Sequence, residues 1–127
     1  PGVLLQNDHQ KFVCRNTFII SQNTEAPISR KVVGQALQIP VAHGEGRYFA
    51  DEKTLDTLES DQQIIFKYCN QAGETGAGNP NGSTHAIAGI CNAGRNVFGM
   101  MPHPERACSA LLGNEDGKKI FESLIFN

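Results

Sequence analysis

The sequence lacks any cluster of lysine and arginine, since its 11 basic residues are dispersed among 13 acidic ones and the net charge is −2. A nucleic-acid-binding protein needs massed positive charge to neutralise phosphates, so this class of protein is disfavoured. Long apolar runs are missing as well, and none approaches the roughly 20 residues of a membrane-spanning helix. No signal peptide is recognisable ahead of the body of the sequence, so we expect neither nucleic-acid nor membrane partners.

Closely spaced cysteines are also absent. The four cysteines, Cys14, Cys69, Cys91 and Cys108, lie far apart without a C-x-x-C pair. Three of the four have apolar surroundings. Two disulfides are the alternative, but this spacing favours reduced thiols in a cytoplasmic protein.

The composition that is present is typical of one globular domain. Of the 127 residues, 39% are apolar and 19% are charged, which suffices for one core but not for two. β-Branched and aromatic residues predict strands at 11–21, 32–43, 63–69, 85–91 and 96–101. Polar or glycine-rich loops are expected at 21–27, 44–49 and 71–84.

Two details qualify the predicted strands. Gly34 and Pro40 are expected to interrupt the extended segment 32–43. The segments 85–91 and 96–101 flank NAGR as a hairpin, and because both are largely apolar, both are expected in the centre of a sheet.

Two helices are predicted. Asp51 can cap the first, at 51–60, and the second, at roughly 116–126, carries an apolar stripe. The residues of this stripe are Ile120, Phe121, Leu124 and Ile125. Strands and helices together predict a sheet covered by helices, in an α/β or α+β domain.

The segment MPHPE at 101–105 is the strongest candidate for chemistry. Proline fixes its own φ and pushes the residue before it towards extended geometry, so Pro102 and Pro104 predict a rigid extended segment. Side chains two residues apart then share one side, which places His103 beside Glu105. A carboxylate beside an imidazole holds one tautomer and stabilises the imidazolium, as in a nucleophilic triad. A solvated surface turn is the alternative.

A nucleophile for this pair is missing from the pattern. Cys91 lies in GICNAG, whereas a nucleophile elbow reads G-x-C-x-G and leads into a helix. Another apolar strand follows Cys91, so it is predicted to be a core cysteine at the end of a hairpin strand. The other three cysteines have no elbow glycines. We therefore expect the nucleophile to lie outside this chain.

Three phrases in this order carry a family resemblance: IPVAHGEGRYFAD at 39–51, NPNGSTHAIAGICN at 79–92 and NVFGMMPHPERA at 96–107. The sequence resembles class I (triad) glutamine amidotransferases, and among them the glutaminase subunits of phosphoribosylformylglycinamidine synthase. The resemblance implies a flavodoxin-like α/β domain, of which residues 1–127 would be the C-terminal portion. The nucleophile-bearing N-terminal portion would be absent.

The resemblance also implies an activity in purine biosynthesis. Glutamine would be hydrolysed to glutamate and ammonia, with His103 as general base and Glu105 as its orienter. The ammonia would pass to a synthetase subunit, which works with a small accessory subunit and uses ATP and magnesium. No cofactor is expected in this chain, and it is expected to be inactive alone.

Two further loops are candidates for site residues. Matching loops of related amidotransferases hold the α-amino and α-carboxylate groups of glutamine, which implies Asn79, Gly82 and Ser83; a plain glycine-rich turn is equally consistent with the sequence. His43 and Glu45, in AHGEG, are placed at the active-site mouth or at the synthetase interface, or simply in a polar turn.

Two other functions stay open. The His43/Glu45 and His103/Glu105 pairs together offer a ligand set for a divalent metal. A non-catalytic interaction module on the same scaffold would explain the missing elbow.

Overall fold

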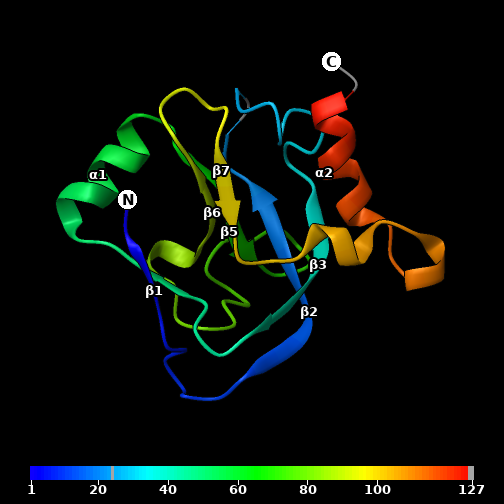
Figure 1. Cartoon of the computed structure of the whole chain (residues 1–127), viewed down its shortest axis with the longest axis horizontal. Coiled ribbons are helices and arrows are strands. Elements are labelled where there is room, and N and C mark those ends of the chain that lie inside the picture. Colours follow the sequence, from blue (N-terminus) through cyan, green and yellow to red (C-terminus); the bar gives the residue numbers. More distant parts are fainter. Residues whose placement is uncertain (24, 126–127) are drawn as a thin grey trace.

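The computed structural model describes residues 1–23 and 25–125, which form a curled sheet with a helix on either side (Figure 1). The main sheet has five strands in the order β3-β2-β5-β6-β7. Their bounds are Ala36–His43 (β3), Val13–Ser21 (β2), Ile64–Cys69 (β5), Ile87–Cys91 (β6) and Phe98–Met100 (β7). A separate pair joins β1 (Val3–Leu5) to β4 (Arg47–Phe49).

The sheet differs from the parallel sheet that a flavodoxin-like domain implies, because each pair of neighbouring strands in it runs antiparallel. A flavodoxin-like sheet is parallel, and parallel neighbours need crossover connections that usually contain a helix. Here β6 and β7 are joined by a hairpin, and helix α1 (Glu52–Ser60) follows β4 of the small sheet rather than linking neighbours of the large one.

Strand β3 shows how the sequence pattern buries one face of the sheet. Buried and half-buried residues alternate along it, so Leu37, Ile39 and Val41 point into the core. His43 continues the same row and is buried as well. The alternation follows from the period of two in a strand.

Pro40 does not interrupt β3, contrary to the prediction. It pairs with Asn16 of β2, and β3 lies at the edge of the sheet. The carbonyl of Pro40 accepts a hydrogen bond from outside the sheet, at the backbone N–H of His103. Since the nitrogen and carbonyl of a strand residue point to the same side, the nitrogen of Pro40 also faces outward and no hydrogen bond to β2 is lost.

The helices cover opposite faces of β5. Asp51 caps α1 by accepting a hydrogen bond from the Thr54 N–H, as predicted. The buried Leu55 and Leu58 of α1 belong to a cluster with Ile64, whereas Ile65, the next residue, belongs to a second cluster. This second cluster contains Ile120 of helix α2 (Asp116–Ile125).

Three other predictions need correction. Strand β7 forms the predicted hairpin with β6 but is an edge strand rather than a central one. Its three residues pair with β6 alone within the described sheet. The predicted loop 44–49 ends in β4, which pairs with β1. In the apolar stripe of α2, Leu124 and Ile125 are 40% and 70% exposed, and residue 126 lies outside the described residues.

No helix in the described part of the chain has the length and apolar character to cross a membrane.

Candidate active site

The backbone around His103 is fixed from two sides. The segment after β7 lies along the outer edge of β3, where the His103 N–H donates to the Pro40 carbonyl at 2.8 Å. Two residues earlier, the Met101 N–H donates to the Ala88 carbonyl of β6 at 3.1 Å. Pro102 is buried, which anchors the segment between these two hydrogen bonds.

His103 and Glu105 meet, but not through the extended segment that the sequence predicts. The 3-10 helix η2 (Pro104–Ala107) begins directly after His103. Proline is favoured at the first helical position, where its fixed φ is already helical and its missing N–H costs nothing. The resulting turn brings His103 Nδ1 to 2.7 Å from Glu105 Oε1.

The contact settles how the two groups share a proton. A carboxylate oxygen accepts, so Nδ1 of His103 carries a proton and Nε2 is left to act as a base. Partial burial raises the pKa of Glu105, but the hydrogen bond from His103 and the nearby charge of Arg106 outweigh it and leave this pKa below its ordinary value. The ionised carboxylate therefore persists at neutral pH and can stabilise an imidazolium.

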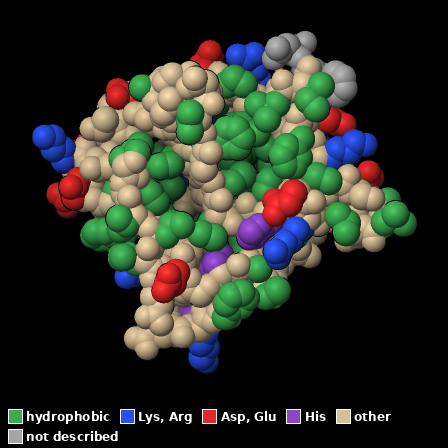
Figure 2. Space-filling model, in the orientation of Figure 1, with side chains coloured by type: hydrophobic (Ala, Val, Ile, Leu, Met, Phe, Trp, Pro, Cys, Tyr) green, Lys and Arg blue, Asp and Glu red, His purple; other side chains and the backbone are tan. Residues whose placement is uncertain are grey.

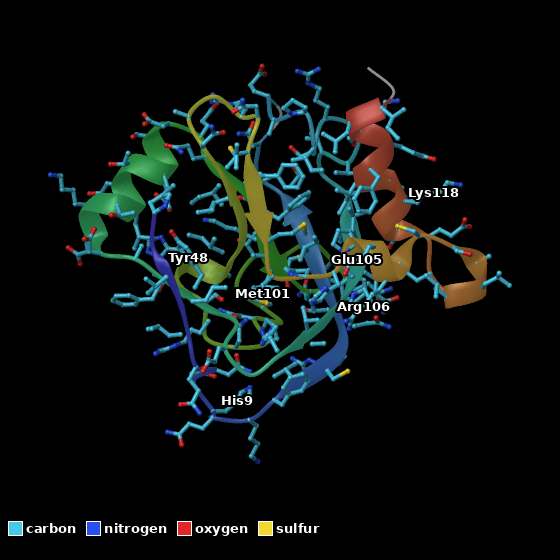
Figure 3. The ribbon with its side chains drawn as sticks, in the orientation of Figure 1. His9, Tyr48, Met101, Glu105, Arg106 and Lys118 are labelled. Carbon is cyan, nitrogen blue, oxygen red and sulfur yellow. The ribbon has the colours of Figure 1, made fainter. Side chains whose placement is uncertain are left out.

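The pair is accessible on the surface of the molecule. The side chains of His103 and Glu105 are 31% and 58% exposed. Figure 3 places Glu105 and Arg106 together on η2, next to β3. On the same face, Figure 2 shows histidine side chains in a row that ends beside an acidic and a basic side chain.

Gly117 is a site residue that the sequence reasoning missed. It lies in the first turn of α2, where a Cβ would collide with the carbonyl oxygen of Pro104 and come within 2.9 Å of the Ala107 oxygen. Only glycine lets α2 approach η2 this closely, so Gly117 fixes the position of the His103 segment. The signal in the sequence was a glycine inside a helical pattern, where it otherwise costs stability.

None of the buried cysteines has the properties of a nucleophile. All four cysteines are free thiols. Burial raises the pKa of Cys69 and Cys91, and burial and the charge of Glu105 raise that of Cys108. A nucleophilic cysteine needs the opposite shift, because the thiolate is the reactive form. Cys14 is exposed on β2.

The structure joins the two candidate loops through buried hydrogen bonds. His43 and Asn81 are in contact, with His43 Nε2 at 3.3 Å from Asn81 Nδ2. The Ser83 hydroxyl is buried and donates to Asn81 Oδ1 at 2.6 Å, while it accepts from the Tyr48 N–H. This hydroxyl is therefore committed to the protein itself in the structure. Glu45 is exposed.

The other two candidates in the 79–83 loop serve its backbone. Asn79 donates from Nδ2 to the Ser83 carbonyl at 3.0 Å. Gly82 has a φ of 78°, which favours glycine, and a Cβ there would meet the carboxylate of Asp8.

The His/Glu pairs do not assemble into a metal site. Among residues 1–23 and 25–125, no group of three or more His, Cys, Asp or Glu side chains is arranged to hold a metal ion. Both ring nitrogens of His43 already face asparagine amides, at Asn7 and Asn81.

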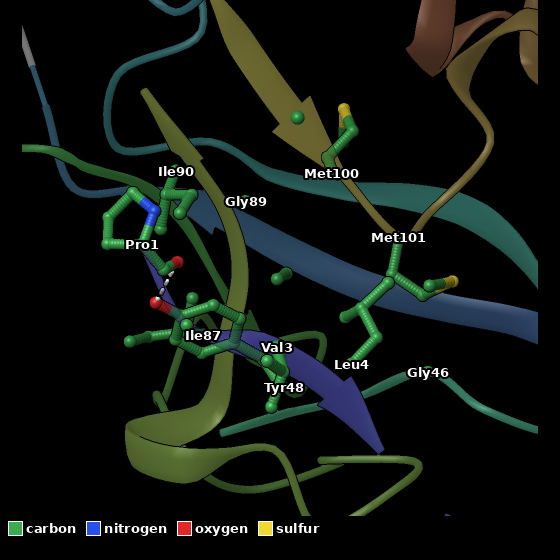
Figure 4. A pocket seen from close by; sticks show the side chains of 13 residues that line it. Pro1, Val3, Leu4, Gly46, Tyr48, Ile87, Gly89, Ile90, Met100 and Met101 are labelled. Atoms are coloured by element: carbon green, nitrogen blue, oxygen red, sulfur yellow. Dashed lines mark hydrogen bonds between the residues drawn. The ribbon is translucent and has the colours of Figure 1, made fainter. Parts of the chain in front are cut away.

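An apolar groove of about 330 Å³ is lined by β1, β6 and residues 99–101, which precede His103 in the chain (Figure 4). β1 and Tyr48 form one wall, and residues 87–90 and 99–101 form the other. The Tyr48 hydroxyl donates to the Pro1 carbonyl across one end, at 3.0 Å. Met101, which lines the groove, lies two residues before His103 in the chain.

Comparison with known proteins identifies relatives of the chain. Residues 2–123 match the family described as CobB/CobQ-like glutamine amidotransferase domain. The chain is 47% identical over 127 residues to phosphoribosylformylglycinamidine synthase subunit PurQ of Gloeobacter violaceus, covering 98% of this chain and 55% of the relative. The corresponding subunit of Alkaliphilus metalliredigens is 50% identical over 126 residues, with 52% of it covered.

A solved structure agrees with these relatives. One chain of "Structure of PurLQS from Thermotoga maritima" superposes with a TM-score of 0.79 and 39% identity, covering 98% of this chain and 52% of that one. The resemblance read from the sequence motifs is thus confirmed. The chain spans about half the length of the curated relatives it matches.

Proposed function

This chain belongs to the CobB/CobQ-like glutamine amidotransferase domain family, and on that premise we propose that it is the His/Glu-bearing part of a PurQ-type glutaminase. The observation that carries the proposal is the 2.7 Å contact between His103 Nδ1 and Glu105 Oε1, on a segment held by β3 and α2. Residues 1–127 would form the C-terminal portion of one glutaminase domain. A cysteine nucleophile would come from a portion that corresponds to the part of the relatives outside the matched region.

The pair can move protons at both stages of amide hydrolysis. Nε2 of His103 takes the proton of the cysteine thiol, and the thiolate attacks the side-chain amide carbon of glutamine. The imidazolium then gives its proton to the departing nitrogen, which leaves as ammonia, and a thioester remains. Water attacks the thioester with Nε2 again as base, and glutamate and the free thiol are released. Glu105 stabilises the imidazolium throughout.

We propose that the part of the longer relatives that this chain does not match packs at the groove. The groove is apolar, β7 beside it has a free edge within the described sheet, and Met101 connects it to His103. An unpaired strand edge and an apolar concave surface are both suited to receive more polypeptide. The relatives are nearly twice as long as this chain, so the same domain contains the material to fill it.

The substrate loop and the partners complete the proposal. Asn79, Gly82 and Ser83 would hold the α-groups of glutamine, chiefly through the backbone, because the Ser83 hydroxyl is already engaged. The ammonia would serve a synthetase subunit and its small accessory subunit, in line with the PurLQS complex to which one relative belongs. This synthetase would use ATP and magnesium, in the cytoplasm, and the present chain would hold no cofactor.

The test is to restore the missing portion. The chain is fused to the part of the Gloeobacter violaceus relative that it does not cover, and the fusion is combined with the synthetase and accessory subunits. In this complex, His103→Ala is expected to lower glutamine-dependent amidine formation by several orders of magnitude, as triad knockouts do. Glu105→Gln is expected to be milder, because it orients the ring and does not transfer the proton.

Synthesis from added ammonia supplies the control, because it bypasses the glutaminase. Both variants should leave the ammonia-dependent rate unchanged. His85→Asn, at an exposed residue whose ring contacts Glu59 of α1, should leave both rates unchanged. Equal loss of the two rates in His103→Ala would reject the catalytic role. If the fusion contains the cysteine elbow but has no glutaminase activity, a non-catalytic interaction module would be favoured instead.

A further inference from the structure

His43 is the centre of a buried hydrogen-bond network that the proposed reaction does not use. The residue is 5% exposed and lies at the end of the apolar row of β3. Nδ1 is 3.0 Å from Asn7 Oδ1, and Nε2 is 3.3 Å from Asn81 Nδ2. The ring therefore stands between the 6–12 segment and the 79–83 loop.

The neighbouring amides determine which ring nitrogen carries the proton. Asn7 cannot be turned over, because its Nδ2 donates to the carbonyls of Lys11 and His43 while its Oδ1 accepts from the Gly46 N–H. With Oδ1 facing the ring, Nδ1 of His43 must be the donor.

Asn81 is oriented just as firmly. Its Oδ1 accepts from the N–H and the hydroxyl of Ser83, and its Nδ2 donates to the Gly46 carbonyl at 2.8 Å. A donor thus faces Nε2 of His43, which must be the unprotonated nitrogen. The network fits a neutral imidazole in the Nδ1–H form and no other state.

The packing around the ring leaves no room for an alternative arrangement. A Cβ on Gly46 would collide with the His43 ring. The other titratable groups that face His43 are His9, from the 6–12 segment, and His103, before η2, and either of them opposes a positive charge on the ring when protonated. Glu45, on the same turn as Gly46, is exposed.

We propose that His43 is a positioning residue whose neutral ring holds the 44–46 turn and the 79–83 loop together, and whose protonation releases that loop. A proton on Nε2 would set donor against donor at Asn81 and bury a charge without a partner, both of which cost free energy. The inference rests on the proposed function in one respect, namely that the 79–83 loop binds glutamine.

Burial supports the direction of this switch. It lowers the pKa of His43 below its ordinary value of 6.5, against a smaller raising effect of the residue's own backbone. As the pH falls below 6.5, the unfolded or opened state takes up the proton first. The contribution of His43 is therefore complete above pH 6.5 and is lost below it.

The tautomer is tested on the unaltered chain by nitrogen NMR of the histidine rings. At about pH 8, the His43 ring is expected to show a protonated Nδ1 and a bare Nε2. A protonated Nε2 at this pH would overturn the proposal, whatever the behaviour of any variant.

The positioning role is tested by hydrogen exchange, with rates corrected for the intrinsic effect of pH. Protection of the amides of Tyr48 and Ser83 is expected to fall about tenfold between about pH 8 and about pH 5, which corresponds to one lost hydrogen bond. In His43→Asn this protection should be low at all these pH values. The matched change His85→Asn, at an exposed histidine, should keep the wild-type profile.

Substrate binding is tested separately in the fused glutaminase. In the wild type, KM for glutamine is expected to rise as the pH falls. His43→Asn is expected to raise KM with a smaller effect on kcat, and to remove this dependence on pH. Protection of the loop that does not depend on pH, or does not depend on His43, would overturn the proposal. A pH-dependent loop with unchanged KM would instead reject the glutamine role of that loop.

Discussion

Glu105 is the residue whose charge state reports most directly on the His/Glu pair. Its pKa is below the ordinary value because the hydrogen bond and the charge of His103 outweigh the effect of partial burial. The ionised form is therefore favoured by folding, and this contribution is present above the unfolded pKa and is lost as the pH falls through the folded one.

The first prediction follows for this residue. In His103→Ala, the pKa of Glu105, measured by carboxyl carbon NMR, is expected to rise, because its hydrogen-bond donor and a neighbouring positive charge are both removed. In the control variant His85→Ala, the pKa of Glu105 should be unchanged. An unchanged pKa in His103→Ala would show that the 2.7 Å contact is not maintained in solution.

Single residues also show what the sequence could predict about the site. The proximity of His103 and Glu105 was predictable from the two prolines, but its route was not, because a proline fits an extended segment and the start of a 3-10 helix equally well. Gly117 could not be assigned to the site, since its role depends on a backbone carbonyl more than ten positions away in the chain. The engagement of the Ser83 hydroxyl likewise depends on Asn81 and Tyr48, which only the fold brings to it.

Helix α2 and the short helix η2 behave as one element of the site. A substitution Gly117→Ala would push a methyl group into the carbonyl oxygen of Pro104, which is backbone and cannot rotate away. We expect a loss of about 1–3 kcal/mol in the free energy of unfolding, as for other overpacked positions, together with a higher pKa of Glu105. Urea denaturation and carboxyl NMR measure the two effects.

Gly99 provides the matched control for this element. A Cβ at Gly99, on β7, meets nothing within 4 Å. Gly99→Ala is therefore expected to change stability by no more than about 0.5 kcal/mol, as at other open positions. Equal effects of the two substitutions would mean that the close approach of α2 to η2 does not contribute to the free energy of unfolding.

The sequence pattern predicts the individual helices and strands well, but it does not predict which strands lie next to each other in the sheet. The cap of α1 and the β6–β7 hairpin are local features, and the sequence pattern predicts both. Whether a strand is central or at an edge depends on strand order, which local periodicity does not contain. For this reason the sequence pattern predicts a central β7 and an interruption at Pro40, whereas β7 is an edge strand and Pro40 lies within β3.

The whole molecule brings together the proposed base His103 and its proposed orienter Glu105, whereas the pKa values of Cys69, Cys91 and Cys108 are all raised. The 127-residue chain alone is therefore expected to release no glutamate from glutamine above the uncatalysed rate. A coupled glutamate assay with the chain alone, and with the fusion described above, measures this. Glutamate release by the chain alone that disappears in Cys91→Ser would contradict the assignment of Cys91 to the core.

At this scale the family could be read from three motifs, whereas the arrangement of the sheet could not. The motifs are short and specific, and the comparisons agree with them over residues 2–123. The flavodoxin-like order came from the resemblance rather than from the strand pattern, and the antiparallel sheet follows from connections that are mostly hairpins and loops.

Pro40 has one further consequence, for the association of this protein with other chains. Its carbonyl tethers the His103 segment, and its nitrogen, which faces the same way, has no hydrogen to offer. An incoming strand that tried to extend the sheet past β3 would find the acceptor taken and the donor missing at the same residue. The residue that anchors the His/Glu pair thereby also protects this edge from aggregation by strand addition.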